Sequence, residues 1–319
     1  MTLQSHPART IAAAHARIAP FVHRTPVLTS RRIDGMVGAS LWFKCENFQK
    51  VGAFKARGAF NAVLSLSDDE ARAGVVTHSS GNHAAALALA AATRGIPAYI
   101  VMPRTASETK KAAVAGYGAE ITFCEPTLAA REEAAAEIQA RTGARLVPPY
   151  DDDAVIAGQA TAAVELIEEV PGLEIVTCPV GGGGLMAGTA LAARWLEPGA
   201  RVIAAEPAGA DDAWRSFTSG VRVAQTSPDT IADGLLTSLG IRNFAVMMAC
   251  VDDVLTVTDA GIIEAMRLIW TSMKIIIEPS AAVPLAALLE HPEAFAGRRV
   301  GMILSGGNVD LDRLPWMAP

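Results

Sequence analysis

A single lysine lies within a run of small and apolar residues, Gly52-Ala53-Phe54-Lys55-Ala56-Arg57-Gly58-Ala59. These neighbours predict that Lys55 is buried, and burial lowers the pKa of an amine because the ammonium form loses its hydration. A neutral lysine amine is a nucleophile that forms Schiff bases with carbonyl groups. The same octapeptide is also compatible with ordinary core sequence, so its chemical interpretation depends on the motifs that follow it.

Two further segments join an expected strand to an expected helix. Ser79-Ser80-Gly81-Asn82-His83 places small hydroxyls and free backbone N–H groups at a helix start, where an anion such as a substrate carboxylate is favoured. Plain N-capping by a serine or by Asn82 explains this sequence equally well. Gly181-Gly182-Gly183-Gly184 is more specific, because four consecutive glycines are entropically unfavourable and a turn needs only one or two. This run predicts backbone amides wrapped round a phosphate.

The segment Ser305-Gly306-Gly307-Asn308 follows an expected strand over 300–304. A hydroxyl at the end of a parallel strand points into the crevice where α/β proteins bind ligands. A simple turn after the last strand is the alternative interpretation of Ser305.

The glycine run also supports a second hypothesis. Gly182-x-Gly184-x-x-Ala187 matches the dinucleotide-binding fingerprint, and Glu206 ends the next expected strand about 20 residues on, as that motif requires. An NAD-dependent dehydrogenase would share this segment. That hypothesis leaves the lysine octapeptide, the turn at 79–83 and the glycines after Ser305 unexplained.

The elements that must position these groups alternate along the chain. From residue 74, strands are expected over 74–77, 98–102, 120–124 and 145–147, and helices over 83–93, 108–117 and 128–141. A second series has helices over 154–170, 185–196, 259–273 and 280–290, and strands over 174–180, 201–206 and 299–304. Such alternation predicts parallel sheets covered by helices, here in two α/β lobes with a cleft between them.

Composition excludes several classes of protein. The 319 residues are 51% hydrophobic and 19% charged, which is typical of a compact globule. A net charge of −6 without a Lys/Arg-rich run argues against a nucleic-acid partner. The longest apolar stretches are broken by charges, as at Lys274 and Glu278, or by glycines, so no membrane span is predicted. Four widely spaced cysteines argue against zinc or disulfides and favour the cytoplasm. No acidic residue precedes Asp34, as in a transit peptide, but 10–19 has the pattern of an ordinary first helix.

In this order and spacing, the four segments resemble the fold-type-II pyridoxal-phosphate enzymes (tryptophan synthase β-like), and within them the serine racemase and threonine/serine dehydratase group. The resemblance covers nearly the whole chain, from Arg24 to Leu311. It implies two lobes, each a parallel-rich sheet covered by helices. Residues 1–66 and 150–319 would form a large pyridoxal-phosphate-binding domain, and residues 67–149 a small mobile domain. It also implies an amino-acid substrate and a homodimer.

The resemblance further implies roles for individual residues. Lys55 matches the Schiff-base lysine, and Ser80 matches a second acid/base residue on the opposite face of the cofactor ring. Phe54 would pack near the cofactor ring, and Asn82 would contact its ring hydroxyl. Gly181 through Gly184 would bind the phosphate, and Ser305 would contact the pyridine nitrogen. The loop holding the substrate carboxylate would contain Ser79, Asn82 and His83.

A metal site is implied in the same way. The segment 206–212 resembles the metal loop of metal-activated members, with Glu206, the carbonyl of Ala210 and Asp212 as ligands. Oxygen ligands suit Mg²⁺, Mn²⁺ or Ca²⁺. A solvated acidic loop without metal is the alternative.

Two features bear on the reaction. A serine at the pyridine nitrogen cannot keep it protonated, so the ring is a weaker electron sink and β-elimination is favoured over transamination. The segment around Arg131 resembles 3-hydroxyaspartate dehydratases and serine racemases, in which an arginine here faces the distal end of the substrate and could pair with a β-carboxylate. A surface arginine pairing with Glu132 or Glu133 is the alternative.

We therefore expect a lyase that converts 3-hydroxyaspartate to iminosuccinate, and then to oxaloacetate and ammonia. Serine or threonine dehydration and serine racemisation are the alternatives within the family. The chain carries no appended regulatory domain after Ser305, which favours a role in amino-acid catabolism.

Overall fold

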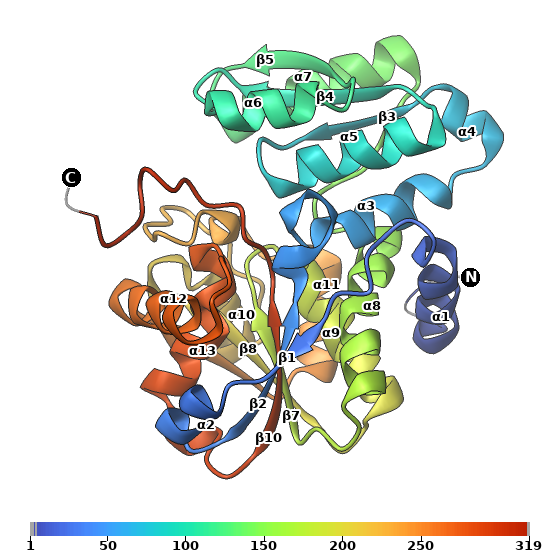
Figure 1. Ribbon diagram of the computed structural model, residues 1–319. Coiled ribbons are helices and arrows are strands. Elements are labelled where there is room, and N and C mark those ends of the chain that lie inside the picture. Colours follow the sequence, from blue (N-terminus) through green and yellow to red (C-terminus); the bar gives the residue numbers. More distant parts are fainter. Residues whose placement is uncertain (1–2, 4, 318–319) are drawn as a thin grey trace.

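Two separate β-sheets divide the computed structural model, which describes Leu3 and residues 5–317, into an upper and a lower lobe (Figure 1). The lower sheet has six strands in the order β1-β2-β10-β7-β8-β9, and the upper has four in the order β5-β4-β3-β6. Only the β1–β2 pair is antiparallel among the strand pairs of the described residues. The expected α/β fold with two parallel-rich sheets is confirmed.

The strands of the large sheet are β1 (Val27–Leu28), β2 (Ser40–Cys45), β7 (Ile175–Pro179), β8 (Arg201–Pro207), β9 (Asp253–Val257) and β10 (Arg299–Leu304). Those of the small sheet are β3 (Val75–His78), β4 (Ala98–Pro103), β5 (Glu120–Cys124) and β6 (Arg145–Leu146). Every residue of β7 is buried, as expected for a central strand of a parallel sheet covered on both faces.

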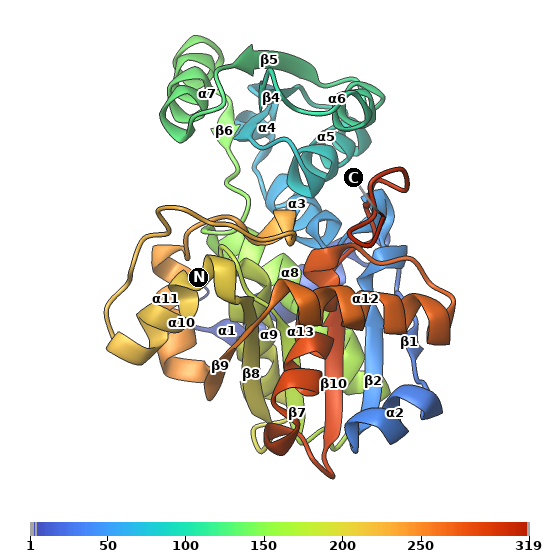
Figure 2. The same cartoon turned by 90° about the vertical axis from the view of Figure 1, so that its left-hand side faces the viewer.

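Helices cover both faces of the large sheet, and two hydrophobic clusters fill the space between them and the strands. One face carries α1 (Pro7–Ile18), α8 (Asp153–Glu169), α9 (Gly184–Leu196) and α11 (Ile241–Cys250); the other carries α2 (Arg31–Val37), α12 (Asp259–Met273) and α13 (Pro279–Glu290). Figure 2 shows α12 and α13 in front of this sheet. The remaining helix at this sheet is α10 (Asp212–Ser219), which follows β8.

The small lobe contains α4 (Asp68–Arg72), α5 (Asn82–Arg94), α6 (Glu108–Ala115) and α7 (Leu128–Thr142). Between the lobes lies α3 (Lys55–Leu64), which packs against α5 on one side and α8 on the other (Figure 1). The lysine motif therefore starts a helix that contacts both lobes.

Helix starts follow the local sequence. Ser67 and Glu70 form a capping box at α4, and Thr258 caps α12 by accepting a hydrogen bond from the Gly261 amide. At α8 the cap is Asp152, whose carboxylate accepts from two backbone amides of the first turn. The caps at Asp152 and Thr258 explain why the predicted starts of α8 and α12 lie within a residue of the observed ones.

The N-terminal segment folds with the rest of the chain. In α1 the residues Ile11, Ala14 and Ile18 are buried at the spacing of one helix face, the first two in a core cluster of the large lobe and Ile18 in the cluster that contains α3. The sequence pattern predicts no element over 31–64, yet α2, β2 and α3 form there. Within the described residues, no helix is long and apolar enough to cross a membrane.

Candidate active site

A cavity of about 490 Å³ between the lobes is lined by every residue predicted to bind cofactor or substrate. These are Phe54, Lys55, Ser79, Ser80, Asn82, His83, Arg131, Gly181 through Gly184 and Ser305. A second cavity, of about 390 Å³ beside α1, is lined by none of them. The predicted metal ligands Glu206, Ala210 and Asp212 also lie outside the lining of the large cavity.

Lys55 is the first residue of α3 and extends along the cavity wall. Its Nζ donates a hydrogen bond to the carbonyl oxygen of Pro149 at 2.7 Å and lies 5.0 Å from the centroid of the Phe54 ring. Burial lowers the pKa of Lys55 to about 8, against the opposing negative charge of Glu278. An amine with this pKa remains mostly protonated near neutral pH, but its neutral fraction is far larger than that of an ordinary lysine, in the direction that the sequence predicts.

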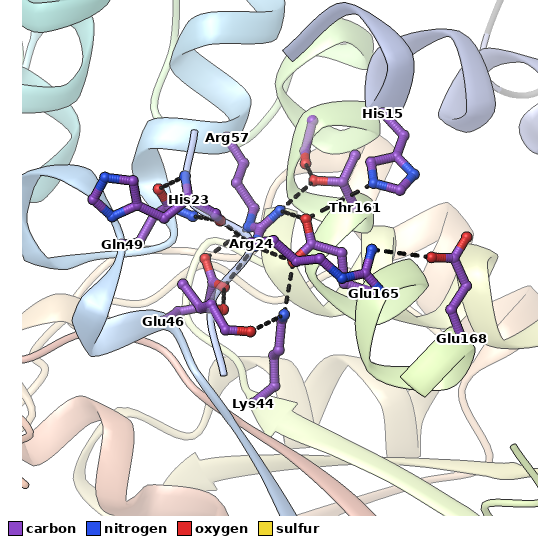
Figure 3. A network of polar contacts seen from close by, with 12 residues as sticks. His15, His23, Arg24, Lys44, Glu46, Gln49, Arg57, Thr161, Glu165 and Glu168 are labelled. Carbon is purple, nitrogen blue, oxygen red and sulfur yellow. Dashed lines mark hydrogen bonds and ion pairs between the residues drawn. The ribbon is translucent and has the colours of Figure 1, made fainter. Parts of the chain in front are cut away.

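A buried ion cluster fixes the start of α3 (Figure 3). Two residues after the lysine, Arg57 has no exposed surface and binds Glu46 through Nε at 2.7 Å and Glu165 through Nη1 at 2.8 Å. The Lys44 ammonium lies 2.6 Å from the Glu165 carboxylate. Two cations thus face two carboxylates, and each charge has a partner within hydrogen-bond distance, as buried charges require.

The cluster joins elements that are distant in sequence. Lys44 belongs to β2, Arg57 to α3 and Glu165 to α8, and Thr161 of α8 also accepts a hydrogen bond from Arg57 at 3.1 Å. Because the guanidinium donates in several fixed directions, it allows α3 little freedom to rotate or slide. The position of Lys55 is therefore set by buried charges behind it, away from the cavity.

The glycine run forms a tight cradle between β7 and α9. Gly183 has φ +89°, in the left-handed region, and no side chain caps α9. A Cβ atom on Gly182 would lie 2.2 Å from the Tyr150 ring, and one on Gly183 would lie 2.6 Å from Leu239. Only glycine fits these positions, and the uncapped amides at the start of α9 can bind an anion. A phosphate group fits this cradle.

The turn before α5 is also uncapped. Gly81 occupies the N-cap position with no side-chain hydrogen bond to the helix, so the N-capping alternative for the serines and Asn82 is wrong. Asn82 and His83 are the first two residues of α5, whereas the family resemblance placed them in the preceding loop. The free amides of this turn lie in the wall of the cavity beside Ser79 and Ser80.

His83 is held in its neutral form. Its side chain is 2% exposed, and Nε2 lies 3.0 Å from the carbonyl oxygen of Val147, to which it must donate. Burial, together with the positive charge of Lys55, lowers the pKa of His83 to about 3. Nδ1 therefore carries a lone pair, and it has no hydrogen-bond partner among the described residues.

Arg131 lies in the first turn of α7 and lines the cavity. Its Nε donates to the carbonyl oxygen of Thr127 at 3.3 Å. In the described part of the chain it forms no ion pair with Glu132 or Glu133, so the alternative of a surface pair is wrong. The guanidinium is thus available to a ligand.

The sequence motifs did not predict three charged residues that line the cavity. Glu278 precedes α13 and is 4% exposed, and Lys110 of α6 binds Asp233 across the cavity at 3.2 Å. A lone acid directly after the apolar run 275–277 was a usable signal for Glu278, because an unpaired buried charge is rare. No local pattern marks Lys110 or Asp233, because their contact joins residues 123 positions apart.

The three predicted metal ligands are buried, whereas Ala208 and Gly209 between them are exposed, so the loop is solvated only in part. Glu206 has no exposed surface, and its two oxygens accept from the amides of Ala213 at 3.0 Å and Trp214 at 2.8 Å. Asp212 is equally buried; its Oδ2 accepts from Leu239, and its Oδ1 has no partner among the described residues. Burial raises the pKa of Glu206 well above its usual value. A cation fits beside an unpartnered carboxylate oxygen, although no cluster of three or more His, Cys, Asp or Glu side chains occurs in the described residues.

The dehydrogenase hypothesis fails at Glu206. In a dinucleotide site this acid must reach a ribose hydroxyl, but here both carboxylate oxygens are turned into the start of α10 and shielded from solvent. The glycine cradle, the uncapped α5 and the lysine of lowered pKa instead form one cavity that fits a phosphorylated aldehyde cofactor.

Comparison with known proteins agrees with this geometry. Residues 18–306 match the family model described as pyridoxal-phosphate dependent enzyme, and the chain belongs to this family. It is 55% identical over 304 residues to a beta-hydroxyaspartate dehydratase of Paracoccus denitrificans, covering 95% of this chain and 96% of that protein. It is 48% identical to an L-threo-3-hydroxyaspartate ammonia-lyase of Saccharomyces cerevisiae, covering 94% and 92%.

A solved structure shows the same fold. The crystal structure of serine racemase from Dictyostelium discoideum superposes with a TM-score of 0.91 at 48% identity, over 95% of this chain and 98% of that one. The expected family and fold are confirmed, and the cofactor of this enzyme is pyridoxal phosphate.

Proposed function

We propose that this enzyme removes water from 3-hydroxyaspartate. The product is iminosuccinate, which takes up water and releases ammonia to give oxaloacetate. The observation that carries this proposal is the unpaired guanidinium of Arg131 in the cavity wall, facing a site where an amino acid must bind. Two relatives named for hydroxyaspartate support the same substrate.

We assign the cofactor contacts as follows. Lys55 is the amine that holds pyridoxal phosphate, and the amides of 181–184 bind its phosphate. Asn82 bonds the ring oxygen, Ser305 bonds the pyridine nitrogen, and Phe54 packs near the ring. When bound, this cofactor supplies an electron sink for the substrate's α-carbon.

The chain's own groups move the protons. The amine of Lys55, with a pKa of about 8, can take a proton from Cα and deliver one to the departing hydroxyl. Ser80 lines the same cavity and serves as the second acid/base when the α-carbon has the opposite configuration. The free amides beside Ser79 and Asn82 bind the α-carboxylate, and the adjacent His83, which is neutral, contributes no charge to this site.

Arg131→Ala tests the substrate assignment. Hydrogen bonds to charged groups contribute about 1.5–3 kcal/mol, so kcat/KM for 3-hydroxyaspartate should fall about 10- to 100-fold, with a smaller fall for serine and threonine. Arg141→Ala is the matched control, because Arg141 lies on the same helix and pairs with Glu120 on the surface. Erythro and threo substrates should be assayed separately. Equal losses for hydroxyaspartate and serine would remove Arg131 from substrate selection and favour a serine or threonine dehydratase.

We also propose that Glu206, the carbonyl of Ala210 and Asp212 hold Mg²⁺, Mn²⁺ or Ca²⁺. The unpartnered oxygen of Asp212 supports this, since such an oxygen is costly to bury without a cation or donor. EDTA should lower the melting temperature and added Mg²⁺ should restore it. Asp212→Asn should abolish this response, while Asp211→Asn, which affects a half-exposed acid paired with Arg215, should not. A melting temperature that ignores both reagents would exclude a structural metal.

The assembly and compartment are part of the proposal. A homodimer is supported by Phe48 and Ile276, which are 45% and 46% exposed and lie close together because Asn47 donates to the Ile276 carbonyl oxygen at 3.0 Å. Sedimentation should give twice the monomer mass, and a monomer at micromolar concentration would contradict it.

Four free cysteines support a reducing cytoplasm, which cell fractionation can test.

A further inference from the structure

Glu278 has an unusual environment for a carboxylate. It lies at the N-cap position of α13, is 4% exposed, and forms no ion pair within the described residues. Both of its oxygens lie 3.2 Å from Nδ2 of Asn82, and Oε2 also accepts from the backbone amide of Asn308 at 3.2 Å. Its contacts are therefore all hydrogen-bond donors, which suit the ionised form.

These contacts determine how the amide of Asn82 is oriented. An ionised carboxylate only accepts, so Asn82 must turn its nitrogen toward Glu278. At the other end, Oδ1 of Asn82 accepts from Nδ2 of Asn308 at 2.9 Å, and Asn308 is itself anchored to the carbonyl oxygen of Val51 at 2.7 Å. Both acceptors of Nδ2 are oxygens of the same carboxylate and lie on one side of it, so a single N–H can serve both and leave the second N–H for a ligand; Asn82 lines the cavity.

Charges from several elements act on this carboxylate. Burial, and then the negative charge of Asp233, raises the pKa of Glu278 to about 7, while Asn82, Asn308 and Lys110 act in the opposite direction. In turn Glu278 acts on Lys55, whose pKa it raises against the effect of burial. The chain thus keeps an acid at a buried position where a glutamine of the same shape would avoid the desolvation cost.

We propose that Glu278 is a positioning residue that fixes Asn82 with a donor N–H toward the cavity, so that the site selects an anionic oxygen on the cofactor ring. This inference rests on the proposed contact between Asn82 and the ring oxygen. A glutamine at 278 could both donate and accept, so it would no longer enforce one orientation of the Asn82 amide. The site would then accept a protonated ring hydroxyl as readily as an oxyanion.

The test measures binding of pyridoxal phosphate to the apoprotein, without substrate. Glu278→Gln should raise the Kd about tenfold, the loss expected for one charge-assisted hydrogen bond, and should shift the pH titration of the bound cofactor's visible absorption. Glu278→Asp should restore part of both. Glu290→Gln, at the far end of the same helix, is the matched control and should change neither.

A double-mutant cycle distinguishes this role from a merely structural one. If Glu278 acts through Asn82, the variant Glu278→Gln/Asn82→Ala should bind no more weakly than Asn82→Ala alone. Full additivity, or a Glu278→Gln protein with unchanged Kd and pH titration, would overturn the inference. Unchanged binding in Asn82→Ala would instead overturn the assigned role of Asn82.

Folding of each apoprotein is checked by thermal unfolding. If Glu278→Gln does not fold, Asn308→Ala supplies a second test, because it frees Oδ1 of Asn82 and leaves Glu278 in place. It should weaken binding in the same direction. Binding equal to that of the wild type would contradict a fixed Asn82 amide.

Discussion

Replacing Glu278 by glutamine should change how the stability of the apoprotein depends on pH. The pKa of Glu278 is raised from 4.5 to about 7, chiefly by burial. The folded state therefore binds this proton more tightly than the unfolded state. The stability that the neutral acid contributes is fully present below pH 4.5 and is lost as the pH rises through about 7.

The size of the effect follows from the shift. About 1.4 kcal/mol per pKa unit over roughly 2.5 units gives about 3 kcal/mol lost between about pH 4.5 and about pH 8. The Glu278→Gln apoprotein has no proton to lose at this position, so it should lack this component. Glu206 and Asp212 also have raised pKa values, but they are present in both proteins and cancel in the difference.

Urea unfolding of both apoproteins at several pH values across this range measures the difference directly. The wild type should lose about 3 kcal/mol more than the variant as the pH rises. Parallel curves for the two proteins would refute the claim that Glu278 is a buried acid that titrates near neutrality. A variant less stable at every pH by a constant amount would indicate lost packing only.

Two further predictions concern the scaffold. Arg57→Met leaves two buried carboxylates short of a partner and should lower the free energy of unfolding by about 3–5 kcal/mol in urea titrations. Arg57→Lys should lower it by less than Arg57→Met does. A loss below about 1 kcal/mol for Arg57→Met would contradict the anchoring role. Gly182→Ala places a Cβ against the Tyr150 ring and should raise the Kd for pyridoxal phosphate at least about tenfold. Gly199→Ala is the control, because a Cβ there meets nothing within 4 Å, and it should leave the Kd unchanged. Equal Kd values for the two variants would show that the cradle can expand.

Much of the site was predictable because its parts are local. The turn at 79–83 and the glycines at 181–184 each follow a strand whose apolar run is visible in the sequence. The carboxyl ends of parallel strands meet at one edge, so motifs after separate strands converge. This is why Asn82 and Ser305 line one cavity, whereas Lys55 was placed beside them by the family resemblance.

The remainder depends on contacts that no short segment encodes. Glu278 meets Asn82 across 196 residues, and Glu165 meets Arg57 across 108. Residues 31–64 carry charges that the fold buries in pairs, so Lys44 in β2 resembles a surface residue in the sequence although it is fully buried. The alternative that a serine or Asn82 caps α5 was wrong, because these side chains line the cavity and leave the first helix amides free.

The central claim is that Lys55 is the residue that holds the cofactor. Borohydride reduction of the holoenzyme, followed by digestion and mass spectrometry, fixes the cofactor to the amine that carries it. We predict a single modified peptide containing Lys55, and a Lys55→Ala protein that is colourless and remains unlabelled. An active yellow enzyme with unmodified Lys55, or a label on another lysine, would contradict the account.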